Sequence, residues 1–157
     1  MHSWISLAYG VLSMPRAYIP VEARELVVAR AQGRCEYCQS VVEYATQSFD
    51  IDHIVPVSRG GTSAVDNLAF ACSGCNSHKF NRLTAPDPVD GTDVPLFHPR
   101  QQRWQDHFGW TEDFTQVVGL TPSGRATVAT LQLNRSGVVS LRRLLCQAGK
   151  HPPALQE

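Results

Sequence analysis

The chain has 157 residues, of which 43% are hydrophobic and 18% are charged, a composition that fits one compact domain and excludes a disordered or collagen-like protein. No run approaches the roughly 20 consecutive apolar residues of a membrane-spanning helix, so we expect no membrane association. Lysine plus arginine and aspartate plus glutamate each number 14, so a polyanionic partner has to be held by local charge.

The chain begins with a segment that we expect to be a loosely attached extension, residues 1–13. It contains neither lysine nor arginine, so it lacks the charged start of a secretory signal, and we expect a cytoplasmic protein. The domain itself is expected to begin near Met14. Pro20, apolar residues at helical spacing and a terminating Gly33 predict a helix over residues 20–32.

Four of the five cysteines form two C-x-x-C pairs, Cys35 with Cys38 and Cys72 with Cys75. This doubled spacing is typical of a structural zinc site with four thiolate ligands, which leaves no open position for catalysis. Zinc thiolates also imply a reducing compartment. The alternative is four unrelated core cysteines or a redox dithiol. The fifth cysteine, Cys146, is expected to be an ordinary buried thiol.

The segment between the cysteine pairs predicts two strands joined by a loop. Residues 49–55 are rich in β-forming residues and end at Pro56, and residues 58–63 form a turn-rich loop. A second strand is expected over 68–71, and the breaker-free segment 76–83 should be helical.

The second half of the chain begins with four prolines within residues 84–99, which predict a connector without a regular element. Beyond it we expect a short helix over 100–108, a hairpin over 110–120, and helices over 121–134 and 138–148. The aromatic residues between Trp104 and Trp110 are expected to form a small core rather than a base-stacking platform.

One constellation combines several spaced elements between Arg34 and Arg82. The first cysteine pair is followed by Asp52-His53-Ile-Val-Pro, then Gly60-Gly61, then Asn67-Leu, and finally Cys72-Ser-Gly-Cys75-Asn76 with Lys79 nearby. This run resembles the zinc-containing type of the HNH endonuclease family, also called His-Me finger or ββα-metal nucleases. Residues 95–145 also resemble the C-terminal part of bacterial HNH-motif proteins.

The resemblance implies an α+β fold with a ββα-metal core stapled by zinc, an N-terminal helix, and a C-terminal hairpin with helices. It divides the chain into an HNH nuclease core (14–83), a connector (84–99) and an accessory region packed on the core (100–157). The implied activity is hydrolysis of DNA phosphodiester bonds. The alternative is a non-catalytic, zinc-stabilised nucleic-acid-binding module, and the oligomeric state is left open.

The resemblance also implies the roles of four residues. His53 would be the general base, Asp52 and Asn76 would hold magnesium or manganese, and Asn67 would brace the loop that orients His53. Asn76 stands where the family often has histidine, so His78 is an alternative ligand or a phosphate contact. Adjacent strand residues point to opposite faces, so Asp52 and His53 are expected where the strand ends or bulges.

Nucleic acid, preferably double-stranded DNA, is the expected partner. Residues 114–156 carry five cations and no acid, which suits phosphate contacts that do not specify sequence. The candidate contacts are Arg59, His78, Lys79, Arg82, Arg142 and Arg143. A solvated helical face is the alternative for the basic residues of the C-terminal third.

Overall fold

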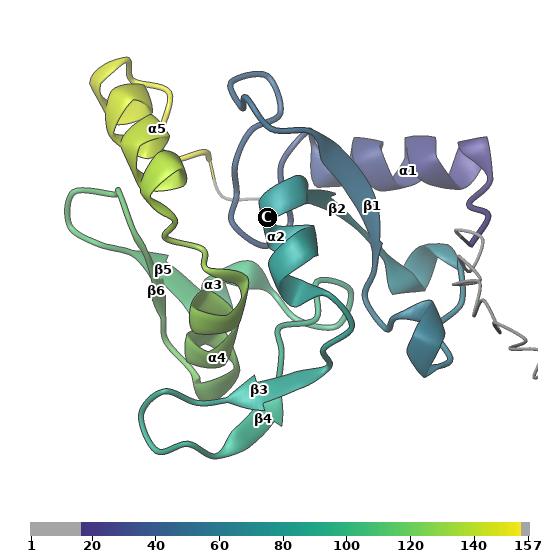
Figure 1. Ribbon diagram of the computed structural model, residues 1–157. Helices are drawn as coiled ribbons and strands as arrows, with labels where there is room; N and C mark the ends of the chain where they lie inside the picture. The colour runs from purple at the N-terminus through teal and green to yellow at the C-terminus, as the bar shows by residue number, and fades with distance from the viewer. Residues whose placement is uncertain (1–16, 155–157) are drawn as a thin grey trace, which may run out of the picture.

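The structure is a computed structural model that describes residues 17–154, so the extension expected over 1–13 lies outside the described part. The elements mix small sheets with helices, which confirms the expected α+β class. In chain order they are α1 (Val21–Ala31), β1 (Phe49–His53), β2 (Leu68–Cys72), α2 (Ser73–Lys79), β3 (Thr84–Pro86), β4 (Asp93–Pro95), α3 (Trp104–His107), β5 (Phe108–Trp110), β6 (Val117–Gly119), α4 (Pro122–Leu131) and α5 (Ser136–Gln147) (Figure 1).

The antiparallel hairpin of β1 and β2 lies between α1 and α2 (Figure 1). Strand side chains alternate between faces. Ile51, Leu68 and Phe70 therefore join Val27 and Ala31 of α1 in one buried cluster. Ala69 and Ala71 point to the opposite face and belong to a second cluster that includes the four paired cysteines.

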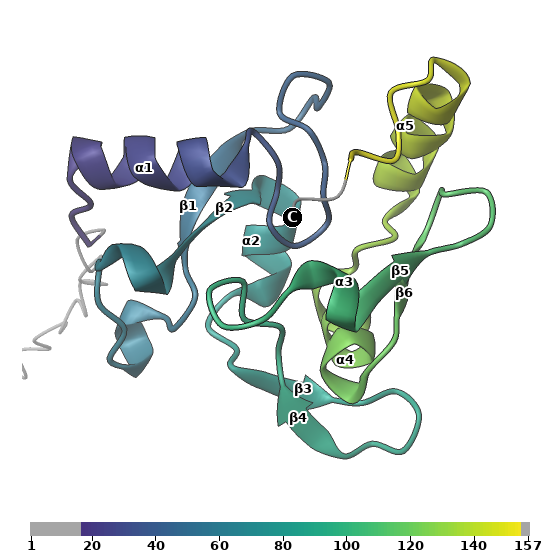
Figure 2. The same ribbon diagram turned by 180° about the vertical axis from the view of Figure 1, so that it is seen from behind.

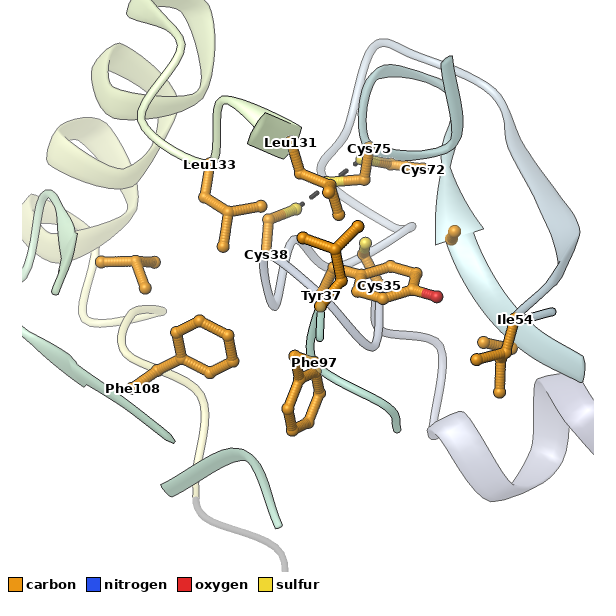
Figure 3. Packing of buried hydrophobic residues seen from close by; sticks show 14 of the residues in the cluster. Cys35, Tyr37, Cys38, Ile54, Cys72, Cys75, Phe97, Phe108, Leu131 and Leu133 are labelled. Atoms are coloured by element: carbon orange, nitrogen blue, oxygen red, sulfur yellow. Dashed lines mark hydrogen bonds between the residues drawn. The ribbon is translucent and has the colours of Figure 1, made fainter. Parts of the chain in front are cut away.

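The C-terminal elements pack around α4, which contacts α2, β3, β4 and β6 (Figure 2). Thr121 caps this helix, because its side-chain oxygen accepts a hydrogen bond from the Gly124 amide at 3.0 Å. In the larger cluster, Phe97, Phe108, Leu131 and Leu133 extend from these elements toward the cysteines (Figure 3). The core therefore runs continuously from the β1–β2 hairpin into the C-terminal third.

The proline-rich segment 84–99 corrects one prediction, because it contains the antiparallel hairpin β3–β4. Pro86 and Pro95 each stand at the end of their strand, where a missing amide hydrogen costs little. Asp87, at the end of β3, forms a bidentate ion pair with Arg125 of α4, with nitrogen to oxygen distances of 2.9 and 2.6 Å. A long-range ion pair thus fixes a hairpin that local sequence does not predict.

Two further expectations need adjustment. The helix expected over 76–83 begins earlier, at Ser73, and ends at Lys79, where Phe80 has a φ of 51°. Cys146 is only half buried, because its stretch of α5 is largely exposed. The aromatic residues behave as expected: the rings of Trp104 and Phe108 lie 5.2 Å apart and pack in the core.

No helix within residues 17–154 is long and apolar enough to span a bilayer.

Candidate active site and metal centre

The four paired cysteines converge on one buried point. Their Sγ atoms all lie within 4.8 Å of one another, and Cys38 and Cys72 are 3.7 Å apart (Figure 3). A tetrahedral zinc ion with Zn–S bonds of about 2.3 Å would space its sulfur ligands about 3.8 Å apart. The residues therefore fit a closed four-thiolate metal centre, which joins the loop after α1 to the start of α2.

A positive charge from the C-terminal third lies against this centre. Arg135 precedes α5, and its Nη2 and Nη1 atoms lie 3.5 Å from Cys72 Sγ and 3.8 Å from Cys75 Sγ. Burial lowers the pKa of Arg135, but the charge of Cys75 and the hydrogen bond to it outweigh this effect and leave the pKa raised. The sequence holds no signal for this contact, because 60 residues separate Arg135 from Cys75.

Asp52 is the centre of a buried network on the α2 side of the hairpin. Its Oδ2 accepts a hydrogen bond from Tyr37 at 2.7 Å, and Lys79 Nζ lies 3.2 Å from Oδ1 and 3.1 Å from Oδ2. Lys79 also donates to the His53 carbonyl at 3.1 Å. Burial raises the pKa of Asp52 although the charge of Lys79 opposes the shift.

Lys79 therefore corrects the expectation of a surface phosphate contact. Its side chain is only 2% exposed, and its ammonium is shared between a carboxylate and a carbonyl. The helical spacing explains the difference: Lys79 follows Cys75 by four residues on α2, so both side chains lie on the inward face.

His53 is the last residue of β1, and the pairing with β2 continues to it without a bulge. Its Nε2 lies 3.0 Å from the hydroxyl oxygen of Ser63, in the loop between the two strands. Burial lowers the pKa of His53, so the imidazole is neutral near pH 7. The sequence analysis did not identify Ser63 as this partner, and the only signal for it is its place in the turn-rich loop.

The Asn67 side chain ties that loop to the end of β1. Its Nδ2 donates to the carbonyls of Val55 and Thr62 at 3.0 and 2.8 Å, and its Oδ1 accepts from the Val55 amide at 2.8 Å. Gly61 lies in the same place, where a Cβ atom would stand 1.7 Å from the Val55 carbonyl oxygen. The loop is therefore closed around a glycine and held by a buried amide.

A groove of about 270 Å³ runs along the outer edge of β1 and brings the candidate residues together. Asp52, His53 and Asn76 all line it, with Arg24 and Phe80 at its sides. Two neighbouring strand residues can share it because β1 pairs on only one side. None of the hydrogen bonds found within residues 17–154 uses the Asn76 side chain, so its amide is available to a ligand. His78 is directed elsewhere: its Nδ1 contacts the Gly74 carbonyl at 2.7 Å.

The basic candidates divide into exposed and buried residues. Arg59 and Arg82 are exposed and hydrogen bond to the carbonyls of Asn81 and His78, and Arg143 is exposed on α5. Arg142 corrects the expectation of a phosphate contact, because it is 3% exposed. Four main-chain and side-chain oxygens accept hydrogen bonds from its guanidinium, those of Thr115, Asn134, Cys38 and Leu133.

Comparison with known proteins gives one match. The family described as HNH endonuclease matches residues 35–82, which include both cysteine pairs, His53 and Asn76. No curated protein and no solved structure matches the chain. The predicted resemblance to the HNH family is confirmed over this segment, and it indicates a nuclease or nucleic-acid-binding function.

Proposed function

We propose that this protein is a metal-dependent HNH endonuclease that hydrolyses phosphodiester bonds in DNA. The observation that carries the proposal is the groove at the edge of β1, where a neutral histidine lies beside a carboxylate and an unpaired amide within the matched segment. In this proposal β1, β2 and α2 form the ββα core of residues 14–83, and the accessory region 100–157 supports it from behind α2.

His53 acts as the general base. With Nε2 held by Ser63, Nδ1 is the nitrogen that accepts a proton from the attacking water. The lowered pKa keeps the ring unprotonated near neutral pH, which a base requires. Asn67 contributes indirectly, because it fixes the loop that carries Ser63 to the end of β1.

Asp52 and Asn76 would hold magnesium or manganese, since carboxylate and amide oxygens are the hard ligands these ions prefer. The bound cation would neutralise charge that develops on the phosphate. Both Asp52 oxygens already lie near Lys79, so we expect the ammonium to give up part of this contact when the cation binds. Zinc at the four cysteines would be structural, because four thiolate ligands fill its coordination sphere.

A non-catalytic nucleic-acid-binding module is the second candidate. The buried Asp52 network favours it, because a carboxylate satisfied by Tyr37 and Lys79 needs no metal to remain stable. In both candidates the exposed residues Arg59, Arg82 and Arg143 supply phosphate contacts without reading the base sequence.

A plasmid-cleavage assay separates the two candidates. Wild-type protein, His53→Ala and the matched control His78→Ala are each checked for one bound zinc, then assayed with magnesium, with manganese and without added cation. We expect cation-dependent cleavage that falls by about 10² to 10⁴ in His53→Ala and persists in His78→Ala. Binding without cleavage by the zinc-loaded wild type would select the non-catalytic module.

A further inference from the structure

A second cavity lies at the other end of α1. Its volume is about 350 Å³, and its walls come from the end of α1, the loop that enters the first cysteine pair, and segment 97–105. None of its lining residues belongs to the groove that contains His53.

The walls of this cavity carry an excess of positive charge. Among residues 17–154, four arginines line it, Arg30, Arg34, Arg100 and Arg103, together with one acid, Glu36. Glu36 forms an ion pair with Arg100 and also accepts a hydrogen bond from the Phe70 amide at 2.8 Å. One carboxylate therefore faces four guanidinium groups.

Two of these guanidinium groups are incompletely satisfied. The Nε atoms of Arg30 and Arg100 are buried, and neither has a hydrogen-bond partner within the described chain. Burial lowers the pKa of Arg100 to about 10, and the nearby charge of Arg30 adds to the shift. A bound anion would relieve both the desolvation and the repulsion between the two arginines.

The remaining wall is aromatic. Trp104 and Trp110 both line the cavity, and their rings lie 5.4 Å apart at an angle of 35°. Arginine forks match phosphate oxygens. Arg142 and His151 already contact the Trp110 ring, so the tryptophans supply an apolar wall beside the phosphate donors and not a stacking platform. The combination suits the phosphate and sugar of a nucleic-acid backbone.

We propose that this cavity, lined by Arg30, Arg100, Arg103 and the two tryptophans, is a second phosphodiester-binding site that anchors the nucleic acid away from the bond being cut. The inference rests on the proposed function, because it takes nucleic acid as the ligand. α1 borders both sites: Arg24 lines the groove and Arg30 lines the cavity, about 9 Å further along the helix axis. That rise equals about three base-pair steps, so one molecule of DNA can occupy both sites.

The test measures binding apart from cleavage. A fluorescent DNA duplex is titrated, at several salt concentrations and without added magnesium, with full-length His53→Ala protein that also carries Arg103→Gln, Glu36→Gln or Lys150→Gln. Arg103 is an exposed wall residue, and Lys150 is a matched exposed cation outside both sites. Zinc content and circular dichroism establish that each variant is folded.

The two cavity variants should change affinity in opposite directions. Arg103→Gln should weaken binding and reduce the slope of log K against log salt by about 1, whereas Lys150→Gln should leave the slope unchanged. Glu36→Gln should strengthen binding, because it removes the carboxylate that pairs with Arg100. A general loss of structure would instead weaken DNA binding in both Arg103→Gln and Glu36→Gln.

Equal slopes of log K against log salt for Arg103→Gln and Lys150→Gln would overturn the cavity proposal. If the wild-type protein cleaves DNA, the nuclease proposal remains intact in that case. Binding that depends on Arg103 in a protein that never cleaves would support the cavity and overturn the nuclease. Absence of DNA binding by the folded protein would overturn both.

Discussion

The imidazole of His53 is held between a strand end and a loop, and its half-burial predicts a pH dependence. Burial lowers the pKa of His53 below the ordinary value of about 6.5. The neutral ring is the base, so the acid limb of kcat/KM for DNA cleavage should be centred below pH 6.5. A profile measured from about pH 5 to 8 checks this, and an acid limb centred above 6.5 would contradict it.

Ser63 is a positioning residue in the proposed mechanism, because it acts through its contact with His53. Ser63→Ala should lower kcat by about 5- to 10-fold, the loss expected when one hydrogen bond that orients the base is removed. The acid limb of the pH profile should shift as well, since the bond from Nε2 to the hydroxyl is lost. Ser63→Thr keeps the hydroxyl and should retain most of the wild-type kcat. An unchanged kcat in Ser63→Ala would contradict the role.

Residue types in a motif could be predicted from the sequence, but their surroundings could not. The motif spacing predicted one site for His53 and Asn76, and both residues line the groove at β1. It could not show that Lys79 lies beneath Asp52 or that Arg142 is buried, because both depend on contacts with distant segments. The sequence does not show whether a given lysine or arginine will hydrogen bond to water or to buried carbonyl oxygens.

At the scale of elements, the loop between β1 and β2 positions Ser63 against His53. Gly61→Ala places a Cβ atom 1.7 Å from the Val55 carbonyl oxygen, so the loop has to shift and carry Ser63 with it. We expect loss of cleavage together with a lower melting temperature, measured by plasmid nicking and circular dichroism.

Gly137, near the start of α5, provides the control for this substitution. A Cβ atom there meets nothing within 4 Å, and alanine stabilises a helix by about 0.5 to 1 kcal/mol relative to glycine. Gly137→Ala should therefore raise the melting temperature slightly and leave cleavage unchanged. Equal tolerance at both glycines would show that the loop is not constrained as described.

Elements with strong local signals were predictable. α1, β1, β2 and the capped helix α4 follow from periodicity, short runs of apolar and aromatic residues, and the Thr121-Pro122 pair. The hairpin β3–β4 was missed because its prolines resemble those of a connector and its anchor, the Asp87–Arg125 ion pair, spans 38 residues. Local composition does not reveal a partner that lies on another element.

At the scale of the whole molecule, one arginine joins three parts of the chain. The guanidinium of Arg142 binds the turn before β6 through Thr115, the cysteine loop through Cys38, and the segment between α4 and α5 through Leu133. Arg142→Ala leaves these buried carbonyls unpaired and should cost at least about 3 kcal/mol of unfolding free energy.

The adjacent Arg143 is exposed and gives the matched comparison. Arg143→Ala should change stability by no more than about 0.5 kcal/mol, while weakening DNA binding if the exposed face of α5 contacts phosphates. Urea denaturation of both variants measures the difference. Similar stabilities for the two variants would contradict the structural role of Arg142.

The contact between Arg135 and the metal centre has a consequence for the order in which the protein is made. All four cysteines leave the ribosome before Arg135, which follows Cys75 by 60 residues. A nascent chain can therefore capture its metal with thiolates alone, and an arginine can offset their excess negative charge only after 60 further residues have been synthesised. The sequence order thus allows metal capture before the segment that carries Arg135 docks against the centre.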